Sequence, residues 1–362
     1  MCAKRDKERY YRMVESVRRK RDTLPANSPI RMLLNDEFLQ GVINRIEQTE
    51  ATNLFYAYWP PVLGLIYYHS VEAINRLNSD LEVVLDASDQ NKRADVLQFL
   101  NARSGKDFGV WYGKLFDLWA KATALKSSNP VELDCSLPNG RDHDMTLTLN
   151  GRKFHLENTV LTKDDEARAV WNRFVEDKRN DPTKMLVRPG AYCPEEAKGP
   201  SPYYDARRFY AKIYDKIAKN LNPDEAQFPD GEPNVLLVSF PEIELRADSP
   251  SNGWVLDELF ADQPNGRHIP APDETSDVSL SAWIDFTAHE LIKHKQMSRE
   301  FYCENFSRII AAPRLLGGIL LFNGTSLVAS RVNYNANTGC KISHREMSDL
   351  EAIFKNNAPY WQ

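Results

Sequence analysis

The chain lacks the paired cysteines that indicate a zinc ribbon or a disulfide framework. Its five cysteines are scattered over 362 residues, and no two of them form a Cys-x-x-Cys pair. We therefore expect a reduced, cytoplasmic protein. The chain is charged from Lys4 onward, so we also expect no secretory signal.

The sequence also has no excess of positive charge. The formal net charge is −5, which excludes a protein that coats nucleic acid through overall basic charge. Any contact with nucleic acid needs a local basic surface. Residues 5–22 offer one candidate, a helix with basic residues at five or more positions. Because acids are interleaved, we favour a solvated helical face over a nucleic-acid-binding arm.

Several common catalytic motifs are also absent. The sequence has no Walker A loop and no serine or cysteine nucleophile elbow. His289 and His294 are five residues apart, whereas the helical zinc-protease motif requires four. These absences exclude the commonest nucleotide-hydrolysing, acyl-transfer and zinc-protease arrangements.

Residues 51–70 are uncharged and approach the length of a membrane span. They contain Pro60-Pro61, His69 and several aromatic residues, so we interpret them as buried helix packing, with a membrane span as the alternative. We expect no membrane partner. The first 104 residues form a predicted α-helical region, with helices at 5–22, 35–49 (capped by Asn35), from Pro61 to about Leu77, and about 89–102.

Residues 131–160 predict three short strands and carry the strongest local signal in the chain. Asn150-Gly151 lies between alternating apolar residues, which is typical of a two-residue type I′ hairpin. This turn fixes the register, because paired residue numbers must sum to 301. One face of the hairpin is then apolar, from Met145, Leu147, Leu149, Phe154 and Leu156.

The other face of this hairpin places two carboxylates across from each other. The register pairs Asp144 with Glu157 and Asp142 with Thr159, with Cβ atoms of a directly opposed pair about 5 Å apart. Like charges so placed are destabilising unless something compensates them. A divalent cation, a shared proton or a nearby lysine would compensate this pair.

The flanking segments place this hairpin between helices. Residues 107–126 predict a strong helix that carries Asp117 on a stripe of small residues, and residues 203–221 predict another. The continuous apolar run 234–240 is typical of a buried parallel strand. Later we expect a helix at 281–310, strands at 315–322 and 326–333, and a helix at about 343–354. Insertions are predicted at 163–202 and 262–280 of an α/β domain spanning 105–362.

This order resembles the core of the PD-(D/E)XK nuclease superfamily, over roughly residues 107–241. The resemblance implies an α/β fold with an αβββαβ restriction-endonuclease-like core and a mixed sheet, preceded by the α-helical N-terminal region. Asp144 matches the family's Asp position and Glu157 its Glu position. Asp117 matches the additional acid often found on the first core helix.

The sequence departs from the family pattern at one position. The family's third residue is usually Lys, and here it is Thr159, which cannot carry a positive charge. Members of the superfamily move this lysine to a neighbouring helix. Lys216 is the favoured replacement, ahead of Lys212 and Lys219.

The resemblance implies Mg²⁺- or Mn²⁺-dependent hydrolysis of nucleic acid, DNA or RNA. Asp144 and Glu157 would hold the metal with the backbone carbonyl of Asn158, and Asp117 would be an outer or second-metal ligand. Catalytic roles fall to Asp144, Glu157, Lys216 and the Thr159 position. Two alternatives stay open: a catalytically inactive nuclease fold that binds nucleic acid or protein, and an enzyme of another class that uses the same carboxylates.

Overall fold

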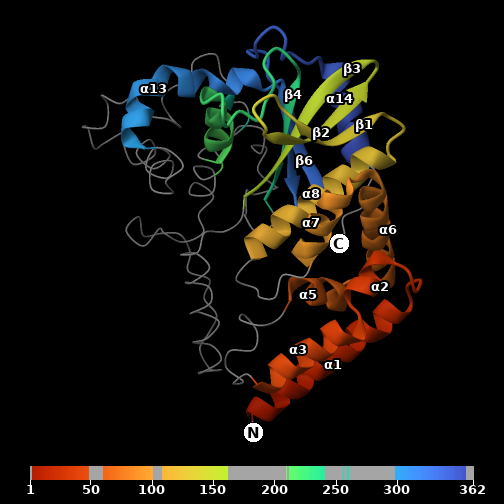
Figure 1. The fold of residues 1–362 in the computed structure, drawn as a ribbon. Helices are drawn as coiled ribbons and strands as arrows, with labels where there is room; N and C mark the ends of the chain where they lie inside the picture. Colours follow the sequence, from red (N-terminus) through yellow and green to blue (C-terminus); the bar gives the residue numbers. More distant parts are fainter. Residues whose placement is uncertain are drawn as a thin grey trace.

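The protein is an α/β structure in which helices pack on an open, six-stranded mixed sheet (Figure 1). A computed structural model describes residues 2–48, 60–100, 108–161, 209, 212–240, 256, 259–260 and 298–355. The predicted insertions at 163–202 and 262–280 lie outside the described residues. So do most of the expected first half of the 203–221 helix and residues 281–297.

The strands follow one another across the sheet in chain order, from β1 to β6. The β3–β4 and β4–β5 pairs are parallel and the other pairs are antiparallel. Every residue of β4 is buried, which explains its continuous apolar sequence. The bounds are β1 Val131–Ser136, β2 Asp142–Leu149, β3 Arg152–Val160, β4 Asn234–Ser239, β5 Gly318–Asn323 and β6 Ser326–Val332.

Helices supply the rest of the described structure. Figure 1 shows α1 and α3 side by side at one end of the molecule, with α6, α7 and α8 between them and the sheet. The helices are α1 Cys2–Asp22, α2 Pro29–Leu33, α3 Asp36–Gln48, α5 Pro61–Tyr68, α6 Val71–Ala87, α7 Gln90–Leu100, α8 Phe108–Lys126, α13 Arg299–Ala311 and α14 His344–Lys355. Short 3₁₀ turns occur at Lys219–Leu221 and Ala312–Leu315.

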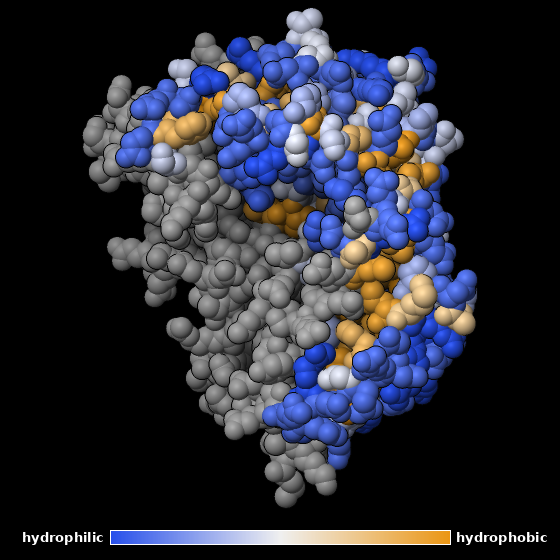
Figure 2. Space-filling view, viewed as in Figure 1, coloured by the Kyte–Doolittle hydropathy of each residue, from blue (hydrophilic) through white to orange (hydrophobic). Residues whose placement is uncertain are grey.

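Two apolar cores cover the two faces of the sheet. The first runs without a break from α1 through α8 to Met145, Leu147 and Phe154 on the hairpin, and on to α14. The second lies on the opposite face, where Ile213 and Ile217 pack against β4 and β5. Figure 2 shows hydrophilic residues over most of the described surface on the face drawn, with hydrophobic residues between them. The boundary near residue 104 remains a prediction.

The segment after Pro61 differs from the predicted single helix ending near Leu77. The chain forms α5, leaves helical geometry at His69 and Ser70, and restarts as α6, because the Ser70 side chain accepts a hydrogen bond from the Ala73 amide at 3.2 Å. The new helix continues to Ala87. None of the described helices is long and apolar enough to cross a bilayer.

Two later boundaries also differ from the predictions. The helix expected from residue 281 has an extended N-cap at Ser298, so α13 begins at Arg299. The strand expected from Leu315 begins at Gly318, because a 3₁₀ turn occupies Ala312–Leu315. By contrast, Asn35 caps α3 as predicted: the Phe38 amide donates to its side-chain oxygen at 2.8 Å.

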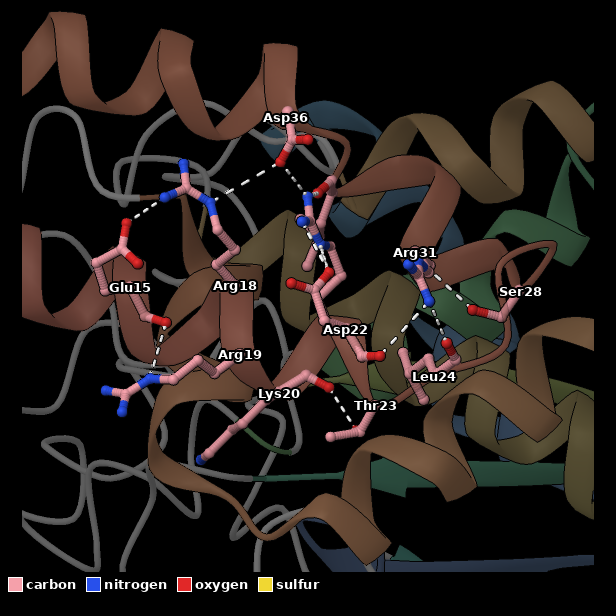
Figure 3. Close-up of polar contacts among 12 residues, drawn as sticks. Glu15, Arg18, Arg19, Lys20, Asp22, Thr23, Leu24, Ser28, Arg31 and Asp36 are labelled. Carbon is pink, nitrogen blue, oxygen red and sulfur yellow. Dashed lines mark hydrogen bonds and ion pairs between the residues drawn. The ribbon is translucent and has the colours of Figure 1, made fainter.

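The basic residues at the C-terminal end of α1 bind acids and carbonyl groups within the helical region (Figure 3). Arg18 pairs with Glu15 and lies 3.8 Å from Asp36. Lys20 donates to three carbonyl groups at the C-terminal end of α5, where a cation also interacts favourably with the helix dipole. Arg21 is buried and pairs with Asp36 at 2.8 Å. The prediction of a uniformly solvated face is therefore wrong for Lys20 and Arg21, whose charges have structural partners.

The Asn150-Gly151 turn has the predicted geometry. Both residues have positive φ, 51° and 80°, as a type I′ turn requires. The strand register follows, with Leu149 opposite Arg152, and the pairs continue to Met145 opposite Leu156. The apolar face is buried as expected, so the turn and the alternation together set which side chains reach the core.

We predict that Gly151→Ala lowers the free energy of unfolding by about 1–2 kcal/mol, because a Cβ is disfavoured at positive φ. Gly113→Ala in the interior of α8 is the matched control. Neither position has an atom within 4 Å of an added Cβ, so only backbone conformation differs between them. Urea unfolding should show Gly113→Ala to be more stable than wild type by about 0.5–1 kcal/mol. If both substitutions changed the free energy of unfolding by the same amount, the type I′ turn at Asn150-Gly151 would be contradicted.

Candidate functional site

The antiparallel pairing of β2 and β3 stops in the middle of both strands. Its last pair is Met145 with Leu156. Beyond that point β2 stays paired with β1 as far as Asp142, and β3 stays paired with β4 as far as Val160. The two strands therefore diverge beyond Met145 and Leu156, and we call this point the β2–β3 fork. On one side of it β2 continues beside β1, and on the other side β3 continues beside β4.

Carboxylates fill this fork by binding backbone amides across it. The Asp144 amide donates to Glu157 Oε2 at 3.1 Å, and the Asn158 amide donates to Asp144 Oδ2 at 2.6 Å. The predicted pairs Asp144–Glu157 and Asp142–Thr159 are thus not part of the strand ladder. At this point side-chain oxygens accept from the Asp144 and Asn158 amides. Asp142 instead pairs with Ser136 of β1.

Helix α8 brings Asp117 to the same fork. The Asn158 side-chain amide donates to Asp117 Oδ1 at 2.8 Å, while the Asn158 main chain holds Asp144. Asn158 therefore joins two of the predicted acids. The neighbours of Asp117 on its helix face include the buried Ala120 and Ala124, and small residues allow α8 to approach the strands closely.

A lysine lies beside these acids from the other face of the sheet. Residues 212–218 are helical, and the Lys216 ammonium forms an ion pair with Glu157 Oε1. The Glu157 side chain is 3% exposed and the Lys216 side chain 15%. Lys219 lies 3.6 Å from Asp215 and is 42% exposed. Among the predicted lysines, Lys216 thus has the position next to the acid.

Thr159 occupies the position at which the family pattern has a lysine. It is buried, and it pairs with Val238 in the parallel β3–β4 ladder. It lies on the same face of β3 as Glu157, because side chains alternate along a strand. The assignment of catalytic and metal-binding roles to Thr159 and to the acids stays a prediction.

The sequence reasoning missed a second lysine. Lys121 is one helical turn beyond Asp117 and only 6% exposed, and its ammonium lies 3.1 Å from Asp117 Oδ2. It also lies 2.7 Å from Asp134 of β1. Asp134 has a φ of 47°, in the left-handed region that side chains disfavour. The available signal was a lone acid–lysine pair at i, i+4 within an apolar helix.

The charges interact strongly because the fork is poorly hydrated. Burial raises the pKa of Asp144 well above its usual value, and the charges of Asp117 and Glu157 raise it further. Burial also raises the pKa of Glu157, although Lys216 opposes this change. The pKa of Lys121 is raised despite its burial, because Asp117, Asp144 and Asp134 favour its charged form. The two cations thus compensate the acids only in part.

A histidine network lies on the same strands, two residues before Glu157. His155 contacts Glu232 through Nε2, and its Nδ1 lies 3.2 Å from the Thr146 hydroxyl and 3.1 Å from His143 Nε2. Burial and the nearby His155 lower the pKa of His143 to about 4. The contacts of His155 fit a buried structural role.

The fork offers oxygen ligands for a hard cation. Within the residues that the structure describes, the Asn158 side-chain oxygen is buried without a hydrogen-bond partner, and burial raises the pKa of the Asp144 carboxyl. Both groups would be satisfied by a divalent cation. No group of three or more His, Cys, Asp or Glu side chains among those residues is already arranged to hold a metal. Metal binding would therefore need Asp117 or Glu157 to turn from its lysine.

No protein-family model, curated protein or solved structure matches the chain.

We predict a pH-dependent stability that depends on Asp144. A folded-state pKa above the unfolded value means that the folded protein takes up a proton more readily, so lowering the pH stabilises it over the range between the two values. In the presence of a chelator, wild type should gain free energy of unfolding relative to Asp144→Asn as the pH falls from 8 toward 4.5. Parallel pH profiles of the two proteins, measured by urea unfolding, would show that Asp144 is not perturbed.

Proposed function

We propose that this protein is a divalent-metal-dependent nuclease that hydrolyses phosphodiester bonds of nucleic acid on a restriction-endonuclease-like αβββαβ core. Helix α8, strands β1, β2 and β3, the helical residues 212–218 and strand β4 follow one another in that order. The antiparallel β1–β2–β3 meander and the parallel β3–β4 pair support this core.

One observation carries the proposal: acids from three elements and a lysine from a fourth meet at the β2–β3 fork. Asp117, Asp144 and Glu157 are linked through Asn158 and neighbouring amides, and the Lys216 ammonium contacts Glu157. Clustering of buried acids costs free energy, and such costs concentrate at functional sites. The lysine that the strand lacks at Thr159 is supplied by a helix.

The residues present fit a Mg²⁺ or Mn²⁺ ion. Asp144 and Glu157 would hold it with the backbone carbonyl of Asn158, and Asp117 would lie in an outer position. The Asn158 side-chain oxygen, buried without a partner, is a further oxygen donor on the opposite face of β3. When bound, the cation would polarise a phosphate and lower the pKa of a water molecule.

The chain's own groups would position the reacting atoms. The Asn158 amide fixes the Asp144 carboxylate, so this acid is held before any ligand arrives. The Lys216 ammonium can donate to a phosphate oxygen or orient a water molecule once it turns from Glu157. Thr159 offers only an uncharged hydroxyl, so Lys216 would supply the positive side chain that this strand lacks for an anionic transition state.

A specific observation also favours the alternative, a catalytically inactive protein that binds nucleic acid or another protein. Lys216 and Lys121 already neutralise Glu157 and Asp117 in this structure. A cluster of this kind can be a purely structural element of the fold.

Activity on mixed DNA and RNA substrates separates these functions. We expect cleavage by the wild-type protein with Mg²⁺ or Mn²⁺, and its loss in Asp144→Asn. Lys216→Met should lower the rate by about 10²–10³-fold, the usual effect of removing one transition-state donor. Lys219→Met is the matched control, because this lysine belongs to the next turn and pairs with Asp215, and it should leave the rate unchanged.

Two results would decide against the proposal. Cleavage that persists in Asp144→Asn would show that the fork is not the active site. No cleavage of either nucleic acid by the wild type, together with no binding of Mn²⁺, would leave the inactive binding protein as the better description.

A further inference from the structure

Lys121 carries a positive charge in a buried position on a helix. It is buried in α8, with its ammonium 3.1 Å from Asp117 and 2.7 Å from Asp134. A buried ammonium is costly unless carboxylates compensate it, so these two acids are required where they are. Asp134 reaches the ammonium from a backbone conformation with a φ of 47°, which is uncommon for residues other than glycine, although Asp adopts it more often than most.

The charges at the fork can be counted. Four carboxylates, on Asp117, Asp134, Asp144 and Glu157, meet two ammonium groups. Asp142 adds nothing to this count, because Lys92 pairs with it at 2.7 Å. With all four carboxylates ionised, as metal binding requires, the remaining charge is −2, which one divalent cation balances. A second divalent cation would leave a partly buried site positive before any substrate arrives.

We propose that the Lys121 ammonium takes the place of a second metal ion, so that the fork binds one divalent cation per chain. Lys121 is a positioning residue in this account: it holds Asp117 and Asp134 and leaves Asp144, Glu157 and Asn158 for the metal. The inference depends on the proposed metal-dependent function and specifies its stoichiometry.

Titration of the full-length protein with Mn²⁺, followed by electron paramagnetic resonance of the free ion, measures the number of bound ions directly. Wild type should bind one Mn²⁺ that Asp144→Asn does not bind. Lys121→Gln keeps two N–H donors for the neighbouring carboxylates but removes the charge, and it should bind two. Lys121→Arg keeps the charge and should bind one.

A charge-balanced double variant provides a second test that does not depend on the folding of Lys121→Gln. Lys121→Gln/Asp134→Asn removes one charge of each sign, so it should again bind one Mn²⁺. Circular dichroism verifies that each variant is folded.

The contradicting outcomes are distinct. Two ions bound by wild type at the Asp144-dependent site would overturn this inference and leave the nuclease proposal standing. One ion bound by folded Lys121→Gln, or two by the double variant, would also overturn it. No ion bound by wild type would contradict the proposed metal-dependent function itself.

Discussion

The site depends on an exchange of hydrogen bonds at the point where the β2–β3 ladder ends. Two amides that would otherwise lose their partners, those of Asp144 and Asn158, are bound by the carboxylates of Glu157 and Asp144. A buried unpaired amide costs about 1–3 kcal/mol, so these bonds hold the two acids firmly in place. The same carboxylates that close the fork are therefore the ones available for chemistry.

The lysines that pair with acids at the fork come from helices on both faces of the sheet. Helix α8 contributes Asp117 and Lys121 from one face, and the helical residues 212–218 contribute Lys216 from the other. The acids outnumber these lysines, and burial together with the charges of Asp117 and Glu157 raises the pKa of Asp144. Unfavourable buried charges of this kind concentrate at functional sites, where a bound ligand can compensate them. This is the physical reason for proposing a metal and an anionic substrate at this place.

Much of the scaffold could be predicted from the sequence because local rules determine it. The Asn150-Gly151 turn fixed the hairpin register, and the apolar run at 234–240 indicated the buried strand. Lys216 was singled out from the resemblance alone; its ammonium pairs with Glu157, and its catalytic role stays a prediction. For the turn and the buried strand, a short sequence interval contains all the information needed.

The fork itself could not be predicted, because strand pairing rules assume that a ladder continues. At its end, side-chain carboxylates bind two backbone amides, which is a tertiary effect. The left-handed Asp134 and the buried Lys121 follow from long-range packing, and neither residue type indicates such a position. The break between α5 and α6 was missed for a simpler reason: Ser70 was not considered as a helix cap.

The most direct test of this account is the anomalous scattering of Mn²⁺ in crystals of the full-length protein. The account predicts a single strong peak at the β2–β3 fork, bound by Asp144 and an oxygen of Asn158, with the Lys121 ammonium still between Asp117 and Asp134. A fork without a peak at saturating Mn²⁺, with Lys216 still paired to Glu157, would contradict it.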